Sequence, residues 1–151
     1  MDNFDRFVND LQAQIFDEAR AAYGEKGFDR WQNPRFNGGM AFPDGWARVT
    51  GECGDSIEIY LKFGNDIVTA ASYLTDGCAS SSICGSFAAE LAMGKDPEQL
   101  IDITGESVLN AIGRLPEDEH HCARLAAAAL QEALSDYMSR RQAEKRRMQQ
   151  E

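Results

Sequence analysis

The chain has 151 residues, of which 43% are hydrophobic, and its formal net charge is −10. This length and apolar content suit one domain whose core is large enough to fold without disulfide bonds. Nucleic acids and anionic membrane surfaces would repel so acidic a body. We therefore expect no nucleic acid and no membrane among its partners, and we expect a partner with a basic docking face.

The N-terminal region is rich in aspartate and lacks the apolar segment of a signal peptide. No apolar stretch is long enough to cross a bilayer. We therefore expect a cytoplasmic protein, in which thiols stay reduced. Four cysteines in such a protein are more often metal-binding, catalytic or buried than disulfide-bonded.

The first predicted element is an amphipathic helix over residues 3–23, because apolar side chains recur there at three- and four-residue spacing. Gly24 and Gly27 are expected to end it. Residues 29–44 are rich in Asn, Gly and Pro, which predicts a loop. Since this loop also carries four large apolar side chains, we expect it to lie along the body of the domain.

Three strands are predicted next, at residues 46–50, 56–63 and 67–74, because apolar and polar side chains alternate in each. The turn signal at residues 64–66 predicts a hairpin between the second and third strands. The pattern of the third strand predicts that Ile67, Thr69, Ala71 and Tyr73 face one way.

Four helices are predicted after the strands, at residues 80–93, 97–101 and 104–112, and from about Glu119 to the end of the chain. Strands followed by helices predict an α+β fold. We expect a three-stranded antiparallel meander with helices packed on one face, an N-terminal helix and a long C-terminal helix.

The last fourteen residues differ from the rest in charge. They hold five of the fifteen basic residues, namely Arg140, Arg141, Lys145, Arg146 and Arg147. A solvated helix end explains them, since cations are favoured near a helix C-terminus. We therefore predict a single domain over residues 1–137 and a basic C-terminal helical tail over residues 138–151.

Two cysteine segments are predicted to meet at one end of the sheet. The turn Gly51-Glu52-Cys53-Gly54-Asp55 joins the first two strands and offers a thiol and a carboxylate. The third strand runs back to the same end, where it delivers Cys78. Glycines let such a turn bend sharply and approach a ligand closely.

A third segment, His120-His121-Cys122, opens the last helix and can reach the same end. A helix N-terminus lowers the pKa of a thiol, so we expect both Cys78 and Cys122 to ionise readily. Together the three segments predict one open, exchangeable metal site. Cys84 lies on an apolar helix face and is expected to be an inert buried thiol, with a second sulfur-accepting or substitute ligand position as the alternative. No CxxC pair of a zinc finger occurs.

These motifs resemble those of the IscU/NifU N-terminal family of iron–sulfur cluster assembly scaffolds. The segments are Gly51-Glu52-Cys53-Gly54-Asp55, Asp76-Gly77-Cys78-Ala79-Ser80-Ser81-Ser82, and Leu115-Pro116 ahead of His121-Cys122. The resemblance implies a carrier rather than an enzyme. Such a scaffold receives sulfur from a cysteine desulfurase, takes up iron, builds a labile 2Fe-2S cluster and transfers it to apo-proteins.

By this resemblance, Cys53, Asp55, Cys78, His121 and Cys122 would hold the cluster or a metal ion. Cys122 would accept the persulfide sulfur, Asp55 would keep the cluster labile, and His121 would be an alternative ligand. A carboxylate or imidazole in place of a fourth thiolate holds soft iron–sulfide less tightly. Zn²⁺ also suits three cysteines with an aspartate or a histidine.

Family members that work with a dedicated Hsp70 chaperone carry Leu-Pro-Pro-Val-Lys before the His-Cys pair, whereas acidic residues follow Leu115-Pro116 here. A chaperone or carrier therefore stays an open partner beside the desulfurase and the apo-proteins. We expect a monomer or a weak homo-oligomer.

Two alternatives to the scaffold function remain: a SufU-like, zinc-bound sulfur acceptor that enhances a desulfurase, and a structural zinc protein. His121 argues against the first, because the SufU branch has a basic residue before the third cysteine.

Overall fold

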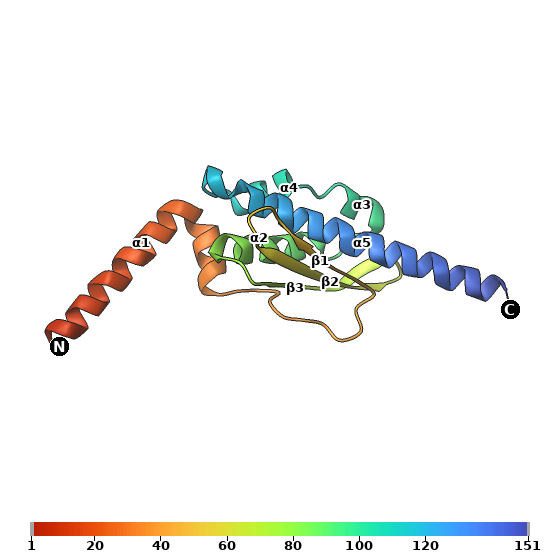
Figure 1. The fold of residues 1–151 in the computed structure, drawn as a ribbon, viewed down its shortest axis with the longest axis horizontal. Helices are drawn as coiled ribbons and strands as arrows, with labels where there is room; N and C mark the ends of the chain where they lie inside the picture. The colour runs from red at the N-terminus through yellow and green to blue at the C-terminus, as the bar shows by residue number, and fades with distance from the viewer. Residues whose placement is uncertain (1, 151) are drawn as a thin grey trace.

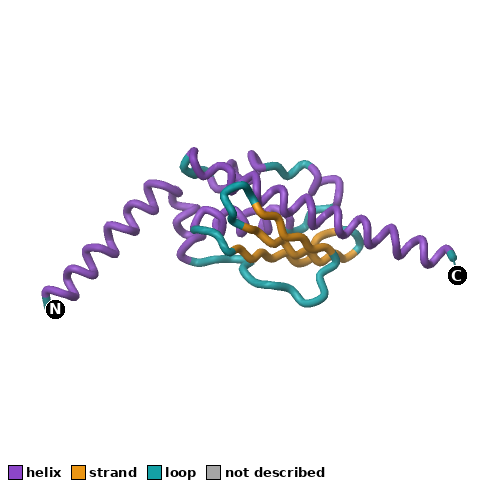
Figure 2. Tube along the Cα trace, viewed as in Figure 1, coloured by secondary structure: helices purple, strands orange, loops and turns teal. Residues whose placement is uncertain are grey.

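The computed structural model describes residues 2–150 and has the predicted α+β fold (Figure 1, Figure 2). The elements in order are α1 (Asn3–Gln32), β1 (Gly45–Thr50), β2 (Ser56–Gly64), β3 (Ile67–Thr75), α2 (Ala79–Ala92), α3 (Pro97–Ile101), α4 (Gly105–Ile112), the 3-10 turn η1 (Glu117–Glu119) and α5 (His120–Gln149). Helices α2 and α5 pack on one face of the sheet. The core between these layers contains Ile57, Ile59 and Leu61 of β2.

The three strands form an antiparallel sheet in the order β1-β2-β3, as predicted. Thr50 pairs with Ser56 at the start of β2, and Ile57 pairs with Thr75 at the end of β3. The β1–β2 turn and the exit of β3 therefore lie at the same end of the sheet. This is the arrangement that brings the first two cysteine segments together.

The prediction that Ile67, Thr69, Ala71 and Tyr73 share one face of β3 is wrong, because only the last two lie on the buried face. Ala71 and Tyr73 are buried, but Ile67 and Thr69 are exposed and Val68 is buried in their place. The register of the β2–β3 pair shifts near the end of β2. Such a bulge inserts one residue, so the alternation of faces changes phase there.

Helix α1 is longer than predicted. Gly24 interrupts it with φ 73° and ψ 179°, but the helix resumes and continues to Gln32. Gly27 therefore does not end the helix, and the predicted loop begins at Asn33 rather than at residue 29. A Cβ atom at Gly27 would lie 2.8 Å from the Cβ of Tyr23, so glycine permits this close packing within α1.

Tertiary contacts explain why the second half of α1 is helical. Phe28 and Arg30 are buried, and the Arg30 guanidinium donates to Ser86 Oγ at 3.0 Å and to Glu90 Oε1 at 2.9 Å. The same guanidinium lies 3.9 Å from the centre of the Phe87 ring. These contacts anchor residues 25–32 of α1 to α2.

The first half of α1 projects away from the body of the domain (Figure 1). We call residues 3–15 the arm. Its large apolar side chains are exposed: Phe4, Phe7, Val8, Leu11 and Ile15. The periodicity predicted this helix correctly, but the stripe does not enter the core. Phe16 makes the first ring contact with the body, edge-on to Phe28 at 5.8 Å.

The segment between α1 and β1 lies along the body, as predicted. Its residues 36–38 bond to the outer edge of β3, since the Gly38 N–H donates to the Tyr73 carbonyl and the Tyr73 N–H donates to the Phe36 carbonyl. The free edge of the sheet is thereby covered at this point, which protects it from pairing with another chain.

Helix α5 runs without interruption through the predicted domain boundary at residue 137. The ring of Tyr137 stacks on Phe63 at 3.6 Å, and Arg141 forms an ion pair with Asp66. The tail, residues 138–151, is therefore tied to the β2–β3 hairpin. The domain boundary at residue 137 stays a prediction. The last residue of the tail, Glu151, lies outside the described residues. Among residues 2–150, no helix is both long and apolar enough to cross a membrane.

Candidate metal centre

Three donor side chains from three different elements converge at one end of the sheet. Asp55 comes from the β1–β2 turn, Cys78 is the N-cap residue of α2, and Cys122 lies in the first turn of α5. One carboxylate oxygen and the two sulfur atoms all lie within 4.8 Å of one another. One metal ion placed among them could be reached by all three.

The backbone of the β1–β2 turn fixes Asp55. The Gly51 N–H donates to the Asp55 carbonyl at 2.9 Å, and the Gly54 N–H donates to the Gly51 carbonyl at 3.0 Å. Gly54 has φ 92°, which side-chain-bearing residues rarely adopt. The glycines of this motif therefore close the turn that carries the carboxylate.

Cys78 is positioned by the residues just before it. The Asp76 carboxylate accepts the Ser56 N–H at 2.8 Å, so the exit of β3 is tied to the start of β2. The Thr75 hydroxyl accepts the Gly77 N–H at 3.0 Å. Cys78 itself is exposed, and its Sγ lies 4.0 Å from Asp55 Oδ2.

Ser81 is the site residue that sequence reasoning missed. It is fully buried, and its hydroxyl donates to Asp55 Oδ2 at 2.9 Å and lies 3.6 Å from Cys122 Sγ. The available signal was the run of three serines directly after Cys78. A serine three residues after a helix N-cap residue lies over that residue, on the side that faces the site.

Cys53 and His121 lie beside this group. In the described part of the chain, Cys53 is not among the three donors that converge. It is exposed and lines a surface hollow of about 630 Å³ with Gly51, Glu52, His121, Arg124 and Leu125. His121 Nε2 lies 3.6 Å from Cys122 Sγ. Cys53 and His121 are therefore neighbours of the centre that could complete it.

The expectation that Cys122 ionises readily is wrong for this structure. The side chain is only 1% exposed, and burial raises the pKa of its thiol to about 11. The nearby Ser81 hydroxyl lowers this pKa, but by less than burial raises it. Desolvation of the charged form outweighs the helix N-terminus, so the thiol is protonated at neutral pH.

The remaining thiol and imidazole are placed as structural groups. Cys84 is buried as predicted, and burial raises the pKa of its thiol strongly. His120 Nε2 lies 3.0 Å from the Leu115 carbonyl oxygen. His121, which lies beside Cys122, is therefore the better placed imidazole.

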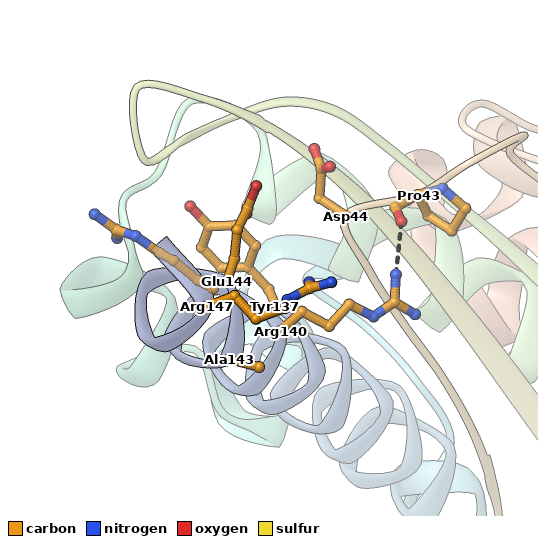
Figure 3. A pocket seen from close by; sticks show the side chains of 8 residues that line it. Pro43, Asp44, Tyr137, Arg140, Ala143, Glu144 and Arg147 are labelled. Carbon is orange, nitrogen blue, oxygen red and sulfur yellow. Dashed lines mark hydrogen bonds between the residues drawn. The ribbon is translucent and has the colours of Figure 1, made fainter. Parts of the chain in front are cut away.

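A second hollow, of about 560 Å³, lies between the C-terminal part of α5 and the segment before β1 (Figure 3). Its lining is Pro43, Asp44, Tyr137, Arg140, Arg141, Ala143, Glu144 and Arg147. There the Arg140 guanidinium donates to the Pro43 carbonyl at 3.0 Å. This lining offers neither a thiol nor an imidazole, so it lacks the donors of a soft-metal site.

The donor set at the sheet end fits a thiophilic metal. Two thiols and one carboxylate supply three ligands, and a fourth from Cys53 or His121 would complete the tetrahedral set that Zn²⁺ prefers. The same thiols suit iron–sulfide, and the carboxylate is the hard member that binds it less firmly.

Comparisons with known proteins place this chain in a family. The model of the NifU-like N-terminal domain matches residues 22–144. The chain belongs to this family. It is 40% identical over 116 residues to "Iron-sulfur cluster assembly scaffold protein IscU 1" of Archaeoglobus fulgidus, covering 76% of each chain. It is 29% identical to the scaffold protein IscU of Aquifex aeolicus, over 77% of this chain and 76% of that one.

The NifU-like fold is also seen in solved structures. The N-terminal NifU-like protein of Brucella abortus superposes with a TM-score of 0.62 at 20% identity, covering 80% of this chain and 96% of that one. This likeness supports the fold. The NifU-like match begins at residue 22, so the arm lies outside it.

Proposed function

We propose that this protein is a scaffold for iron–sulfur cluster assembly. It receives sulfur from a cysteine desulfurase, takes up iron, builds a labile 2Fe-2S cluster and passes the cluster to apo-proteins. The observation that carries this proposal is the convergence of Asp55, Cys78 and Cys122 in a NifU-like domain. We further propose that it works in the cytoplasm, where its four free cysteines stay reduced.

In this function Cys78, Cys122 and Asp55 hold the cargo, and Cys53 or His121 supplies the remaining position. Cys122 accepts the sulfur: its sulfur attacks the terminal sulfur of the desulfurase persulfide, a new S–S bond forms, and the desulfurase cysteine leaves as a thiolate. Cys122 gives up its thiol proton in this step, and the departing thiolate can take it up. Because Cys122 is buried, the desulfurase has to open the site before transfer.

Reconstitution tests the proposal. The purified protein, given a cysteine desulfurase, cysteine and ferrous iron without oxygen, should develop the visible absorption of a 2Fe-2S centre. Cys84→Ala is the control and should behave as the wild type, because Cys84 is buried outside the donor group. A folded wild-type protein that forms no such centre contradicts the proposal.

Asp55→Ala should give a cluster with a longer lifetime than that of the wild type. The hard carboxylate is the ligand least suited to soft iron–sulfide, so its loss should favour tighter retention by the remaining donors. The decay of visible absorption after transfer to a chelating buffer measures the lifetime. A shorter lifetime for Asp55→Ala would contradict the labilising role.

A second function, a zinc-bound sulfur acceptor that enhances a desulfurase, is favoured by the same donor set, which suits tetrahedral Zn²⁺. Such a protein accelerates the desulfurase and forms no cluster in the reconstitution.

A structural zinc protein would unfold when the metal is removed. We expect this domain to stay folded, because its core of β2, α2 and α5 side chains does not depend on the site.

A further inference from the structure

We propose that Ser81 is a positioning residue that holds the Asp55 carboxylate in place and thereby sets how tightly the centre binds an ion. The inference rests on the proposed function in one respect, namely that Asp55, Cys78 and Cys122 act as ligands. Nothing in the cysteine motifs assigns a role to Ser81, and its own contacts carry the argument.

The hydroxyl of Ser81 connects the elements that meet at the site. Ser81 is the third residue of α2, and it donates across to Asp55 in the β1–β2 turn at 2.9 Å. Its Oγ also lies 3.6 Å from Cys122 Sγ on α5. A hydroxyl has only one proton to donate, and the shorter distance assigns it to the carboxylate.

Gly77 provides an independent sign that this hydrogen bond is built into the packing. A Cβ atom at Gly77 would lie 2.7 Å from Asp55 Oδ2 and also 2.7 Å from Ser81 Oγ. Both distances are shorter than carbon and oxygen tolerate. The backbone at Gly77 therefore covers the Ser81–Asp55 pair from one side, and only a residue without a side chain fits there.

The neighbouring serines have other partners. The Ser80 hydroxyl donates to the Glu119 carboxylate, and the Ser82 and Tyr73 hydroxyls are 2.9 Å apart. Ser81 is thus the member of the serine run whose hydroxyl bonds to a donor of the metal centre. Ser82→Ala removes an equivalent hydroxyl from the same helix turn and is a matched control.

The effect of Ser81 follows from its bond to a ligand. A hydrogen bond to a ligating carboxylate fixes its orientation, and losing such a partner typically weakens metal binding about 10–100-fold. Asp55 is only half-buried, in a surface turn. Without Ser81 the Asp55 carboxylate can rotate into solvent. Ion binding would then have to order this carboxylate, which lowers the affinity for the ion.

The test measures the Zn²⁺ affinity of the full-length protein by competition with a chelator. Ser81→Ala should bind Zn²⁺ about 10–100-fold more weakly than the wild type, and Ser82→Ala should bind as the wild type does. Gly77→Ala, which displaces the same pair from the other side, should also weaken binding. In an Asp55→Ala background, Ser81→Ala should cause no further loss of Zn²⁺ affinity. If Ser81 had a merely structural role, its loss would weaken binding in that background too.

The outcomes separate the two proposals. If Asp55→Ala and Cys122→Ser bind Zn²⁺ as tightly as the wild type, the ligand set itself is wrong. If Asp55→Ala weakens binding but Ser81→Ala and Gly77→Ala do not, the role of Ser81 is overturned and the ligand set stands. If Ser81→Ala weakens Zn²⁺ binding just as much in the Asp55→Ala background, the proposed role of Ser81 is also overturned. Thermal unfolding of each variant confirms that the compared proteins are folded.

Discussion

Cys122 shows how burial decides the state of a thiol. Cys78 and Cys122 both lie at the N-terminal end of a helix, but Cys78 is exposed and Cys122 is buried. The raised pKa of Cys122 follows from the loss of water around its charged form. A helix position can be predicted from the sequence, whereas the burial of one side chain depends on the whole fold.

The donors themselves were predictable, and their supporting residue was not. Thiols and carboxylates between glycines stand out in a sequence, so Asp55, Cys78 and Cys122 could be named in advance. Ser81 could not, because each of three consecutive serines bonds to a different partner. Only the packing of α2 on the β1–β2 turn distinguishes them.

Asp66 yields a pH-dependent prediction. Hydrogen bonds from Tyr137 and Arg141 lower the pKa of its carboxyl below the ordinary value of 3.8. A lowered folded-state pKa contributes stability above the unfolded-state pKa, and that contribution is lost as pH falls through the folded-state pKa. Asp66→Asn should therefore lower the free energy of unfolding at pH 7, and the gap to the wild type should shrink below about pH 4. Urea unfolding across this range measures it.

Asn is a suitable replacement because Asp66 has φ 64°, a conformation that Asn tolerates well. Asp17→Asn is the control, since Asp17 lies on the exposed part of α1 and its ion pair to Arg20 is long, at 3.6 Å. A difference between Asp66→Asn and wild type that is the same at pH 3 as at pH 7 would contradict the electrostatic account.

At the scale of elements, boundaries marked by local signals were predicted closely. Asp96 and Pro97 open α3, and Thr104 and Gly113 bracket α4, as expected from capping chemistry. The errors arose where distant contacts decide. The second half of α1 is helical despite its glycines because Arg30 is bonded to α2, and the bulge in the β2–β3 pair is set by pairing, not by either strand alone.

Arg30→Ala should destabilise the domain by about 2 kcal/mol, because hydrogen bonds to charged groups contribute about 1.5–3 kcal/mol and solvent screens part of this pair. Arg30 is 7% exposed, but its partner Glu90 is 37% exposed and can be rehydrated. Chemical denaturation measures the loss. Arg35→Ala is the control: Arg35 is 62% exposed and 3.9 Å from Glu90, so we expect less than about 1 kcal/mol. Equal losses would show that the buried bonds of Arg30 do not anchor α1.

At the scale of the whole molecule, two helices project at opposite ends of an elongated body (Figure 2). The arm was predicted as a helix, but its exposure was not, because periodicity shows that a face is apolar and does not show what covers it. The family match begins after the arm, so the fold of the domain does not require it.

A variant that lacks residues 2–15 should keep the thermal stability and the Zn²⁺ affinity of the full chain. The arm contributes exposed side chains, and ring contacts with the body begin only at Phe16. Circular dichroism melting and the chelator competition measure both properties. A lower melting temperature, or weaker Zn²⁺ binding, would show that the arm supports the domain.

The covered sheet edge restricts how partners can bind. Proteins often capture an extended peptide by adding it as a further strand to an open sheet edge. Here residues 36–38 already hydrogen-bond to the edge strand β3 at Tyr73. At the other edge, the Asp136 carboxylate of α5 accepts the Trp46 N–H of β1. Strand addition is obstructed at both points. A desulfurase or client protein is therefore expected to recognise side chains on the turn and helix ends, where Cys53 and Cys78 are exposed.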